Sequence, residues 1–331
     1  MVVYKYSFVF VFAAVIHLSP SAGLAPVLKL NNGKEIPGFG IGTWLGTNSN
    51  ELKGDEVQKS VEWAIDAGYR HIDTAAIYST EDQVGRAIKK KIAEGVVKRE
   101  DLFVTTKLWN TNHKKEAVLP ALRKSLKNLD LDYVDLYLIH WPIALHDNAS
   151  ISQTDYVETW QAMTDVLNQG LTKSIGVSNF NIQQLERLKS EGGVTPSVLQ
   201  VEINLNLQQP ALLDYCKAQG IVVVAYTPFG NLFNRQPSAP APRADDQRLV
   251  AIAQKYKKTV PQIVLRYLVE LGVIPIPKSL HKDRVEENIQ IYDFSLTPDE
   301  IQLLKSFDNG YRTLSPLFWA HSPYFPFESK N

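Results

Sequence analysis

Two patterns of hydrophobic and polar residues, one typical of strands and one typical of helices, alternate along the chain. Short runs rich in β-branched and aromatic residues predict strands at residues 39–44, 71–74, 102–107, 133–140, 174–178, 198–203, 221–226 and 273–277. Between these runs apolar residues recur at helical spacing, as Val57, Val61 and Ile65 do before Gly68. Strands that alternate with amphipathic helices predict a parallel sheet.

Residues that suit helix ends mark the boundaries of the helical stretches. Thr80 with Gln83 and Thr297 with Glu300 have the spacing of capping boxes, which begin helices. Prolines suited to a first turn and glycines suited to a helix end mark four further boundaries: Pro210, Pro261, Gly220 and Gly272.

The number of strands and the lack of a second boundary predict the fold class. Eight strands alternating with helices favour an α/β fold, a closed (β/α)8 TIM barrel, over an open doubly wound sheet. Gly38, Gly40 and Gly42 open no helix, so they do not match the phosphate-binding fingerprint of the open-sheet fold. We expect an N-terminal β-hairpin at 27–36, long C-terminal loops and a single domain over 24–331. The proline-containing stretch 231–246 predicts a long functional loop after the seventh strand.

The first residues have the pattern of a signal peptide, predicted to span residues 1–23. Lys5 precedes nine apolar residues at 8–16, and small residues follow before a cleavage site near Gly23. Nine apolar residues are too few to span a bilayer, so we expect a secreted protein with no stable membrane insertion after cleavage. An uncleaved membrane anchor is the alternative, because no charge lies between Lys5 and Lys29. On this route Asn148, which begins the sequon Asn148-Ala149-Ser150, is a candidate for N-glycosylation.

Charge and cysteine content narrow the classes of partner. The chain has 35 basic and 35 acidic residues, so no net field attracts nucleic acid or anionic lipid. We therefore expect a small, largely neutral substrate and no nucleic-acid partner. We also expect a monomer. Cys216 is the single cysteine; it cannot form an intrachain disulfide and lies in an apolar helical stretch, where we expect it to pack.

Four polar residues with compatible chemistry recur at the spacing of the repeat. Asp73, Lys107 and His140 are 34 and 33 residues apart, and each stands at the end of a predicted strand. Neighbouring parallel strands lie about 4.8 Å apart, so these side chains should converge on one rim of a barrel. Tyr78 follows Asp73 by five residues, in the loop beyond the strand.

This group suits proton donation to a carbonyl oxygen. A phenol has a pKa of about 10, and we expect a buried ammonium at Lys107 to lower the pKa of Tyr78. Asp73 would keep Lys107 charged, and His140 would orient the carbonyl. The group delivers only a proton, so the hydride must come from a cofactor, and no metal site is needed. Taken singly, Asp73 also suits a helix cap, Lys107 a solvated charge and His140 a packing residue; together the four favour catalysis.

The segments that carry these residues resemble the signature segments of aldo-keto reductases. They are HIDTAAIY at 71–78, TKLW at 106–109, IHWP at 139–142 and IGVSNF at 175–180, within a match from about 28 to 309. The resemblance implies an NADPH-dependent oxidoreductase on a (β/α)8 barrel with Tyr78, Asp73, Lys107 and His140 as catalytic residues. Since a subgroup that reduces steroid C=C bonds carries glutamate in place of His140, the resemblance implies reduction of C=O.

The same resemblance implies the cofactor contacts. They are Thr43, Trp44, Asp73, Ser178, Asn179, Gln200, Tyr226, Lys278, Ser279, Arg284, Glu287 and Asn288. Tyr226 would stack on the nicotinamide, and the cations Lys278 and Arg284 suit the 2′-phosphate of NADPH better than a ribose hydroxyl. The alternatives are that Ser178 and Asn179 cap the helix beginning near 182 and that Tyr226 is barrel core.

Aromatic residues predict the substrate pocket, formed by Trp44, Trp109, His140 and Trp141. The tail Pro316-Leu317-Phe318-Trp319, with Tyr324 and Phe325, would close over it; alternatively, the tail packs on outer helices. Such a pocket suits aldehydes, ketones or steroids. The combination of a signal peptide and an aldo-keto reductase domain resembles the insect 3-dehydroecdysone 3β-reductases. This resemblance suggests an ecdysteroid as the substrate. The rival hypothesis is a catalytically silent NADPH-binding sensor or structural protein on the same barrel.

Overall fold

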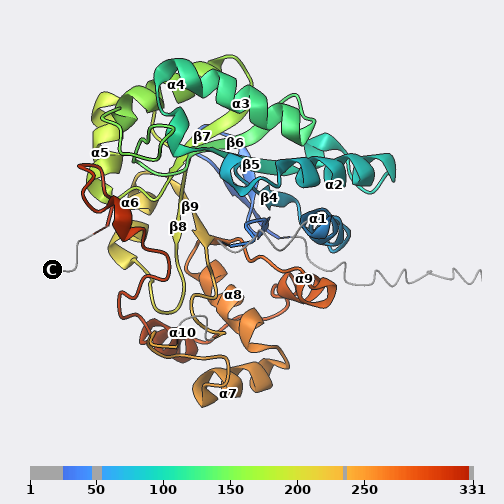
Figure 1. Cartoon of the computed structure of the whole chain (residues 1–331). Coiled ribbons are helices and arrows are strands. Elements are labelled where there is room, and N and C mark those ends of the chain that lie inside the picture. The colour runs from blue at the N-terminus through green and yellow to red at the C-terminus, as the bar shows by residue number, and fades with distance from the viewer. Residues whose placement is uncertain (1–24, 47–53, 234–236, 328–331) are drawn as a thin grey trace, which may run out of the picture.

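The predicted strands form one parallel barrel in the computed structural model, which describes residues 25–46, 54–233 and 237–327 (Figure 1). The predicted signal peptide at 1–23 lies outside the described residues. Neighbouring strands follow one another in chain order. They are β3 (Gly40–Gly42), β4 (His71–Asp73), β5 (Phe103–Leu108), β6 (Val134–Ile139), β7 (Thr172–Ser178), β8 (Val198–Glu202), β9 (Val222–Tyr226) and β10 (Ile274–Pro275). This order confirms the (β/α)8 barrel.

The barrel closes where β3 meets the end of β10. The Gly42 N–H donates to the Pro277 carbonyl over 3.0 Å. A Cβ on Gly42 would lie 3.0 Å from the Ile276 carbonyl oxygen, and one on Gly40 would lie 2.8 Å from the His71 ring. The alternating glycines therefore permit close packing at the seam. β10 is shorter than the predicted strand at 273–277 because prolines cannot donate to a ladder.

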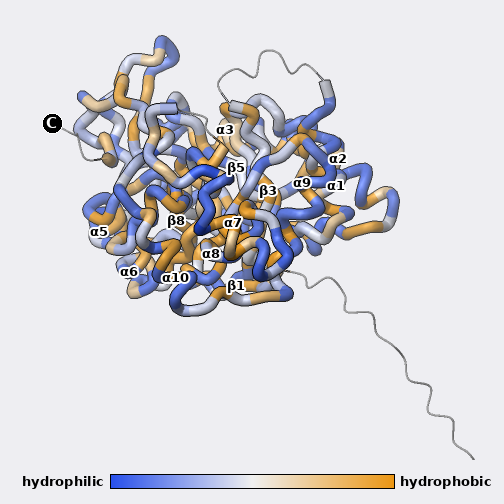
Figure 2. The backbone as a smooth tube through the Cα atoms, turned by 90° about the horizontal axis from the view of Figure 1, so that it is seen from below, coloured by the Kyte–Doolittle hydropathy of each residue, from blue (hydrophilic) through white to orange (hydrophobic). Residues whose placement is uncertain are grey.

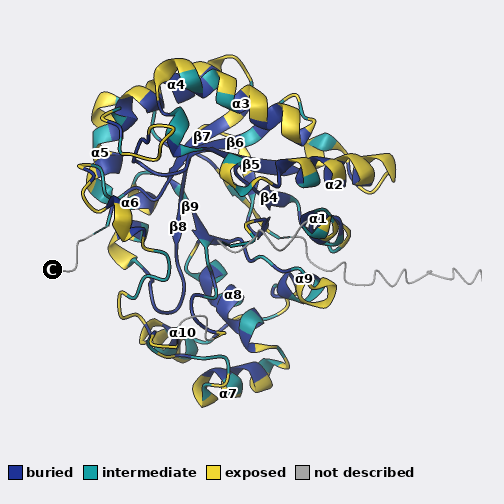
Figure 3. Cartoon of the chain, in the orientation of Figure 1, coloured by how far each residue is buried: buried dark blue, intermediate teal, exposed yellow. Residues whose placement is uncertain are grey.

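Helices cover the outside of the barrel and present one apolar face to the strands. They are α1 (Glu56–Asp66), α2 (Glu81–Ala93), α3 (Lys115–Leu129), α4 (Tyr156–Asn168), α5 (Ile182–Glu191), α6 (Pro210–Ala218), α8 (Val260–Glu270) and α9 (Lys282–Asn288). Two helices add to the repeat: α7 (Gln247–Tyr256) and α10 (Pro298–Lys305). Figure 3 shows buried strands at the centre and exposed outer helix faces, and Figure 2 shows hydrophobic and hydrophilic stretches alternating along the outer layer. This amphipathic pattern is the signal that made the helices predictable.

A β-hairpin closes one end of the barrel. β1 (Val27–Lys29) pairs antiparallel with β2 (Glu35–Pro37), as predicted for 27–36. Leu30 and Ile36 are buried in one cluster with strand residues such as Leu136 and Leu138. Functional side chains are consequently left to the carboxyl ends of the strands.

The capping signals are only partly correct. Thr297 and Glu300 form the predicted capping box, and α2 begins directly after Thr80. The predicted box at Thr80 is wrong, because Gln83 Oε1 accepts instead from the backbone N–H groups of Val57 (3.0 Å) and Gln58 (3.2 Å). Gln83 of α2 thus caps the neighbouring helix α1, whose own N-cap residue makes no side-chain cap.

The remaining boundary signals agree with the structure. Pro210 and Pro261 lie in first helical turns, and Gly220 and Gly272 have positive φ just beyond helix ends. Cys216 is buried on α6, where burial raises the pKa of its thiol to about 12 and leaves it protonated.

A long loop follows β9, in agreement with the prediction for 231–246. Described residues between 227 and 246 form neither helix nor strand.

In the described part of the chain, no helix is long and apolar enough to cross a membrane. The same residues contain no cluster of His, Cys, Asp and Glu that would hold a metal ion.

Candidate active site

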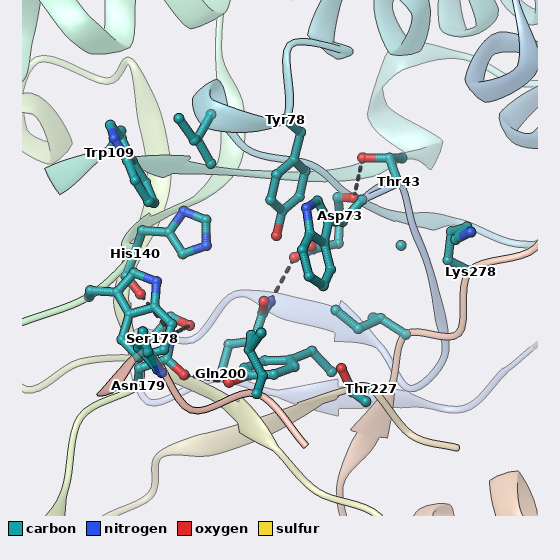
Figure 4. Close-up of a pocket in the computed structure, with 18 of the residues that line it drawn as sticks. Thr43, Asp73, Tyr78, Trp109, His140, Ser178, Asn179, Gln200, Thr227 and Lys278 are labelled. Atoms are coloured by element: carbon teal, nitrogen blue, oxygen red, sulfur yellow. Dashed lines mark hydrogen bonds between the residues drawn. The ribbon is translucent and has the colours of Figure 1, made fainter. Parts of the chain in front are cut away.

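A cavity of about 400 Å³ opens at the carboxyl ends of the strands (Figure 4). Most of the predicted catalytic, cofactor and substrate residues line it: Thr43, Trp44, Asp73, Tyr78, Trp109, His140, Trp141, Ser178, Asn179, Gln200, Tyr226 and Lys278. Lys107 is fully buried directly behind this wall. The structure therefore brings the four predicted catalytic residues together.

Asp73 and Lys107 form a buried ion pair at the base of the cavity. Lys107 Nζ lies 2.5 Å from Asp73 Oδ1 and also donates to the Thr74 carbonyl over 2.9 Å. The second carboxylate oxygen accepts from Gln200 Nε2 over 2.7 Å. Burial raises the pKa of Asp73 and lowers that of Lys107, and in each case the charge of the partner opposes the shift. The attraction between the two charges and their hydrogen bonds to Gln200 and Thr74 thus favour the charged forms against the effect of burial.

Tyr78 reaches this pair because the loop after β4 turns back on itself. A 3-10 turn, η2 (Ala76–Tyr78), ends at Ser79, which has a φ of 56°. The Tyr78 hydroxyl lies 3.3 Å from Lys107 Nζ. Burial raises the pKa of Tyr78 well above its ordinary value, and the charge of Asp73 adds to the shift. The expectation of a lowered pKa for Tyr78 is therefore wrong here, because desolvation of the phenolate dominates.

His140 follows β6 directly and faces the same point. Its backbone N–H donates to the Leu108 carbonyl over 3.2 Å, and its ring meets the rings of Tyr78 and Trp109 edge to face at 5.7 and 5.3 Å. Burial, reinforced by the charge of Lys107, lowers the pKa of His140 well below its ordinary value. A neutral imidazole keeps one N–H, which can donate to a carbonyl oxygen.

Ser178, Asn179 and Tyr226 form one hydrogen-bonded side of the cavity. Asn179, with a φ of 63°, donates through Nδ2 to the His140 carbonyl over 2.9 Å and accepts from the Tyr226 hydroxyl over 2.7 Å. The helix cap of α5 is Asn181 in a capping box with Gln184, so the cap alternative for Ser178 and Asn179 is wrong. Tyr226 is half-buried and lines the cavity, so it is not simple barrel core.

The predicted adenosine end continues from the cavity along β10 and α9. Lys278 lines the cavity, and Ser279 accepts through Oγ from the His281 N–H over 3.1 Å. Arg284 is exposed on α9, and Glu287 accepts from the Thr259 hydroxyl over 2.6 Å. Four residues do not line this cavity, and their role as cofactor contacts stays a prediction: Ser279, Arg284, Glu287 and Asn288.

Aromatic rings of the C-terminal tail form a further wall of the cavity. Trp319 packs against Trp109 and Trp141, with centroid distances of 6.2 and 5.6 Å, and the tail residues Pro316 and Phe318 also line the cavity. The tail therefore reaches the catalytic face, as predicted.

The far part of the tail behaves differently from the prediction. Tyr324 packs on Tyr156 of α4, with centroids 5.0 Å apart, and Phe325 packs on Phe327 at 5.6 Å. Neither Tyr324 nor Phe325 lines the cavity. The alternative of packing on the outer helices is correct for Tyr324, whereas Phe325 packs on Phe327 and on the cluster that contains Trp141 and Trp319.

Several residues of the site were not predicted. Ile77, Thr227, Pro228, Phe229, Leu314 and Ser315 also line the cavity. They lie in loops whose course has no periodic signal in the sequence. Glu202, buried at the end of β8, was missed although a lone acidic residue in an apolar strand pattern is a recognisable signal.

Comparisons with known proteins agree with this geometry. A family model described as "Aldo/keto reductase family" matches residues 39–309. Aldo-keto reductase AKR2E4 of Bombyx mori is 50% identical over 303 residues, which cover 91% of this chain and 98% of that protein. Dihydrodiol dehydrogenase 3 of Bos taurus is 42% identical over 316 residues, covering 91% and 97%.

Solved structures show the same similarity. The crystal structure of AKR2E4 of Bombyx mori in complex with NADP is 49% identical with a TM-score of 0.90, and the match covers 92% of this chain and 100% of that one. A structure of aldo-keto reductase AKR2E5 complexed with NADPH is 47% identical with a TM-score of 0.90, covering 92% and 94%.

Proposed function

Because this chain belongs to the aldo/keto reductase family, we propose that it reduces the carbonyl group of a small apolar aldehyde or ketone to an alcohol, using NADPH. One observation carries the proposal. The Tyr78 hydroxyl lies 3.3 Å from an ion-paired buried ammonium, in the wall of an apolar cavity that His140 also lines.

The residues along the cavity fit an NADPH molecule. When bound, NADPH supplies the hydride. Ser178, Asn179 and Gln200, which lie together in Figure 4, would offer hydroxyl and amide groups to the nicotinamide amide. The Tyr226 ring, which lines the same cavity, would offer a flat face. Lys278 and Arg284, with Ser279, Glu287 and Asn288 nearby in sequence, would hold the adenosine end, where two cations suit a phosphate dianion.

The protein's own groups manage the proton. The carbonyl oxygen of a substrate would accept hydrogen bonds from the Tyr78 hydroxyl and the neutral His140 ring. A raised pKa keeps Tyr78 protonated until negative charge develops on that oxygen, which then takes the Tyr78 proton. The ammonium of Lys107, fixed by Asp73, stabilises the phenolate that is left.

The cavity wall indicates the substrate class. Five aromatic side chains make much of the wall apolar, so a bulky neutral carbonyl compound should bind better than a charged one; they are Trp44, Trp109, Trp141, Phe318 and Trp319. Within this class we propose a ketosteroid, with an ecdysteroid such as 3-dehydroecdysone as the specific candidate.

The test is NADPH oxidation at 340 nm with a panel of small aldehydes, aromatic aldehydes and tetracyclic ketones. We expect turnover, with higher kcat/KM for bulky apolar ketones than for charged aldehydes. Tight NADPH binding without turnover of any carbonyl compound would instead favour a sensor or structural protein on the same barrel.

We also propose that residues 1–23 direct the protein into the secretory route and that Asn148 is glycosylated there. Asn148 is exposed in a turn in which its Oδ1 accepts from the Ser150 N–H and hydroxyl, over 3.1 and 2.6 Å. Expression in insect cells should yield protein in the medium whose mass falls on deglycosylation and in an Asn148→Gln variant. Protein confined to the cytosol would overturn secretion, and protein retained with membranes would favour the uncleaved anchor.

A further inference from the structure

Glu202 is a fully buried carboxylate that the proposed reaction does not use. It is the last residue of β8, two residues after Gln200, which donates to Asp73. In the ladder it is paired with Tyr226 of β9. Glu202 therefore stands at the edge of the surface proposed to carry the nicotinamide.

The carboxylate of Glu202 holds a distant part of the chain by its backbone. Its Oε1 accepts from the Thr313 N–H over 2.8 Å and from Asn204 Nδ2 over 3.0 Å. Its Oε2 accepts from the Leu314 N–H over 2.9 Å. A buried carboxylate is stable only when both of its oxygens accept hydrogen bonds. The Glu202 side chain therefore depends on the Thr313 and Leu314 N–H groups, and in turn it fixes the position of that backbone.

Residues 314–319, which we term the C-terminal wall, begin at this anchor. Leu314, Ser315, Pro316, Phe318 and Trp319 of this segment line the cavity. Its backbone–backbone hydrogen bonds are local, such as that from the Trp319 N–H to the Pro316 carbonyl.

The chain is held again beyond the C-terminal wall. Gln184 Nε2 of α5 donates to the Tyr324 carbonyl over 2.9 Å, and Asn181 Nδ2 donates to the Pro326 carbonyl over 3.2 Å. Between the two anchors Leu317 and Phe318 are 64% and 71% exposed. Trp319, by contrast, is buried against Trp141 and fixes the far half of the segment. The exposed side chains contribute little to holding the near half, so the position of Leu314 and Ser315 over the cavity depends on the hydrogen bonds to Glu202.

We propose that Glu202 is a positioning residue that holds the C-terminal wall against bulky apolar substrates and thereby sets the enzyme's preference for them over small aldehydes. This inference rests on the proposed carbonyl reduction. Tyr78, His140, Leu314 and Phe318 line the same cavity, so a bulky ketone whose carbonyl meets Tyr78 and His140 would also contact the C-terminal wall. A three-carbon aldehyde would be held at the catalytic end alone.

The test variant is Glu202→Gln, which keeps the shape but leaves one acceptor oxygen for two backbone N–H groups. We expect KM for a tetracyclic ketone to rise at least tenfold. The kcat/KM for propanal should stay within about threefold, and the Kd for NADPH within about twofold. Hydrogen–deuterium exchange should accelerate at the amides of residues 313 and 314 and remain unchanged in β9.

Glu270→Gln is the matched control. Glu270 on α8 also accepts a backbone N–H, from Leu296 over 3.0 Å, together with Arg266 Nε over 2.6 Å. This control should lower stability without changing the ratio of ketone to aldehyde kcat/KM. An equal change of that ratio in both variants would show general loosening of the barrel and overturn the proposal.

Two further outcomes separate this inference from the proposed function. If the unmodified protein oxidises NADPH with neither substrate, carbonyl reduction fails and the inference with it, whatever the exchange result. If it is active but Glu202→Gln changes both substrates equally or neither, only the positioning role is overturned. Should Glu202→Gln not fold, Thr313→Pro removes one N–H donor and keeps the carboxylate; it should shift selectivity in the same direction, and unchanged selectivity would overturn the proposal.

Discussion

At the scale of single residues, the site is organised by the buried pair of Asp73 and Lys107. Each charge is removed from water, and each is stabilised by the other and by hydrogen bonds from Gln200 and to Thr74. Removing one partner of such a pair leaves an uncompensated buried charge, whereas removing both does not. Variants that lack one partner and variants that lack both should therefore differ in stability, although both kinds lack the ion pair needed for catalysis.

Lys107→Met should therefore lower the free energy of unfolding by about 3–5 kcal/mol, because Asp73 is left buried without its ammonium. The double variant Asp73→Asn with Lys107→Met should recover most of that loss and remain inactive. Urea unfolding and NADPH oxidation on the same samples measure both quantities. A double variant no more stable than Lys107→Met would mean that the pair is not the source of the loss.

The sequence predicted the identity of these residues better than their electrostatics. Asp73, Lys107 and His140 recur at repeat spacing, and that spacing alone is enough to place them at one rim of a barrel. The direction of the Tyr78 pKa shift was not predictable, because it depends on how completely the fold excludes water from the hydroxyl. Glu202 was missed because its partners, Thr313 and Leu314, are more than one hundred residues away.

At the scale of elements, helices α1 and α2 are joined by a cap that crosses between them. Gln83 has the spacing of a capping box with Thr80, yet its side chain accepts from the first N–H groups of α1. Sequence spacing reports only local partners, so a cap supplied by a neighbouring helix cannot be seen in it.

Gln83→Ala should lower the free energy of unfolding by about 1 kcal/mol, the usual value of an N-cap hydrogen bond. Thr80→Ala should cost less, because the Thr80 side chain makes no cap hydrogen bond. Thermal or urea unfolding of the two variants compares them directly. Equal losses would support the local box and contradict the cap between helices.

The elements themselves were the most predictable level of structure. Strand and helix periodicity located the eight barrel strands, while β10 proved shorter because of its prolines. The C-terminal tail was predicted only in part. Its aromatic residues can pack on the cavity wall or on the outer helices. Trp319 packs on the cavity wall and Tyr324 on helix α4, and the sequence does not distinguish the two.

At the scale of the whole molecule, three buried histidines couple folding to pH. Burial lowers the pKa of His71 and of His113 to about 3, and the pKa of His140 well below its ordinary value. An unfolded chain titrates these groups near pH 6.5. As pH falls from about 6.5 towards 3, the unfolded chain binds protons that the folded protein does not, so stability decreases.

We expect the contribution of these histidines to the free energy of unfolding to be nearly constant above pH 7. Below pH 6.5 this contribution should fall. Each histidine contributes up to about 1.4 kcal/mol per pH unit. His113→Asn should reduce the slope between pH 6 and 4 by about that amount, whatever its effect on stability at pH 7. An unchanged slope, measured by urea unfolding, would show that His113 titrates normally in the folded protein.

The account depends above all on Tyr78 as the proton donor. Its most direct test is Tyr78→Phe, assayed for NADPH oxidation with a carbonyl substrate and for NADPH binding by fluorescence. Since general acid catalysis contributes about 10²–10⁴-fold, kcat should fall by at least about 10²-fold while the Kd for NADPH changes less than about twofold. Turnover retained within about tenfold of the unmodified enzyme would contradict the mechanism.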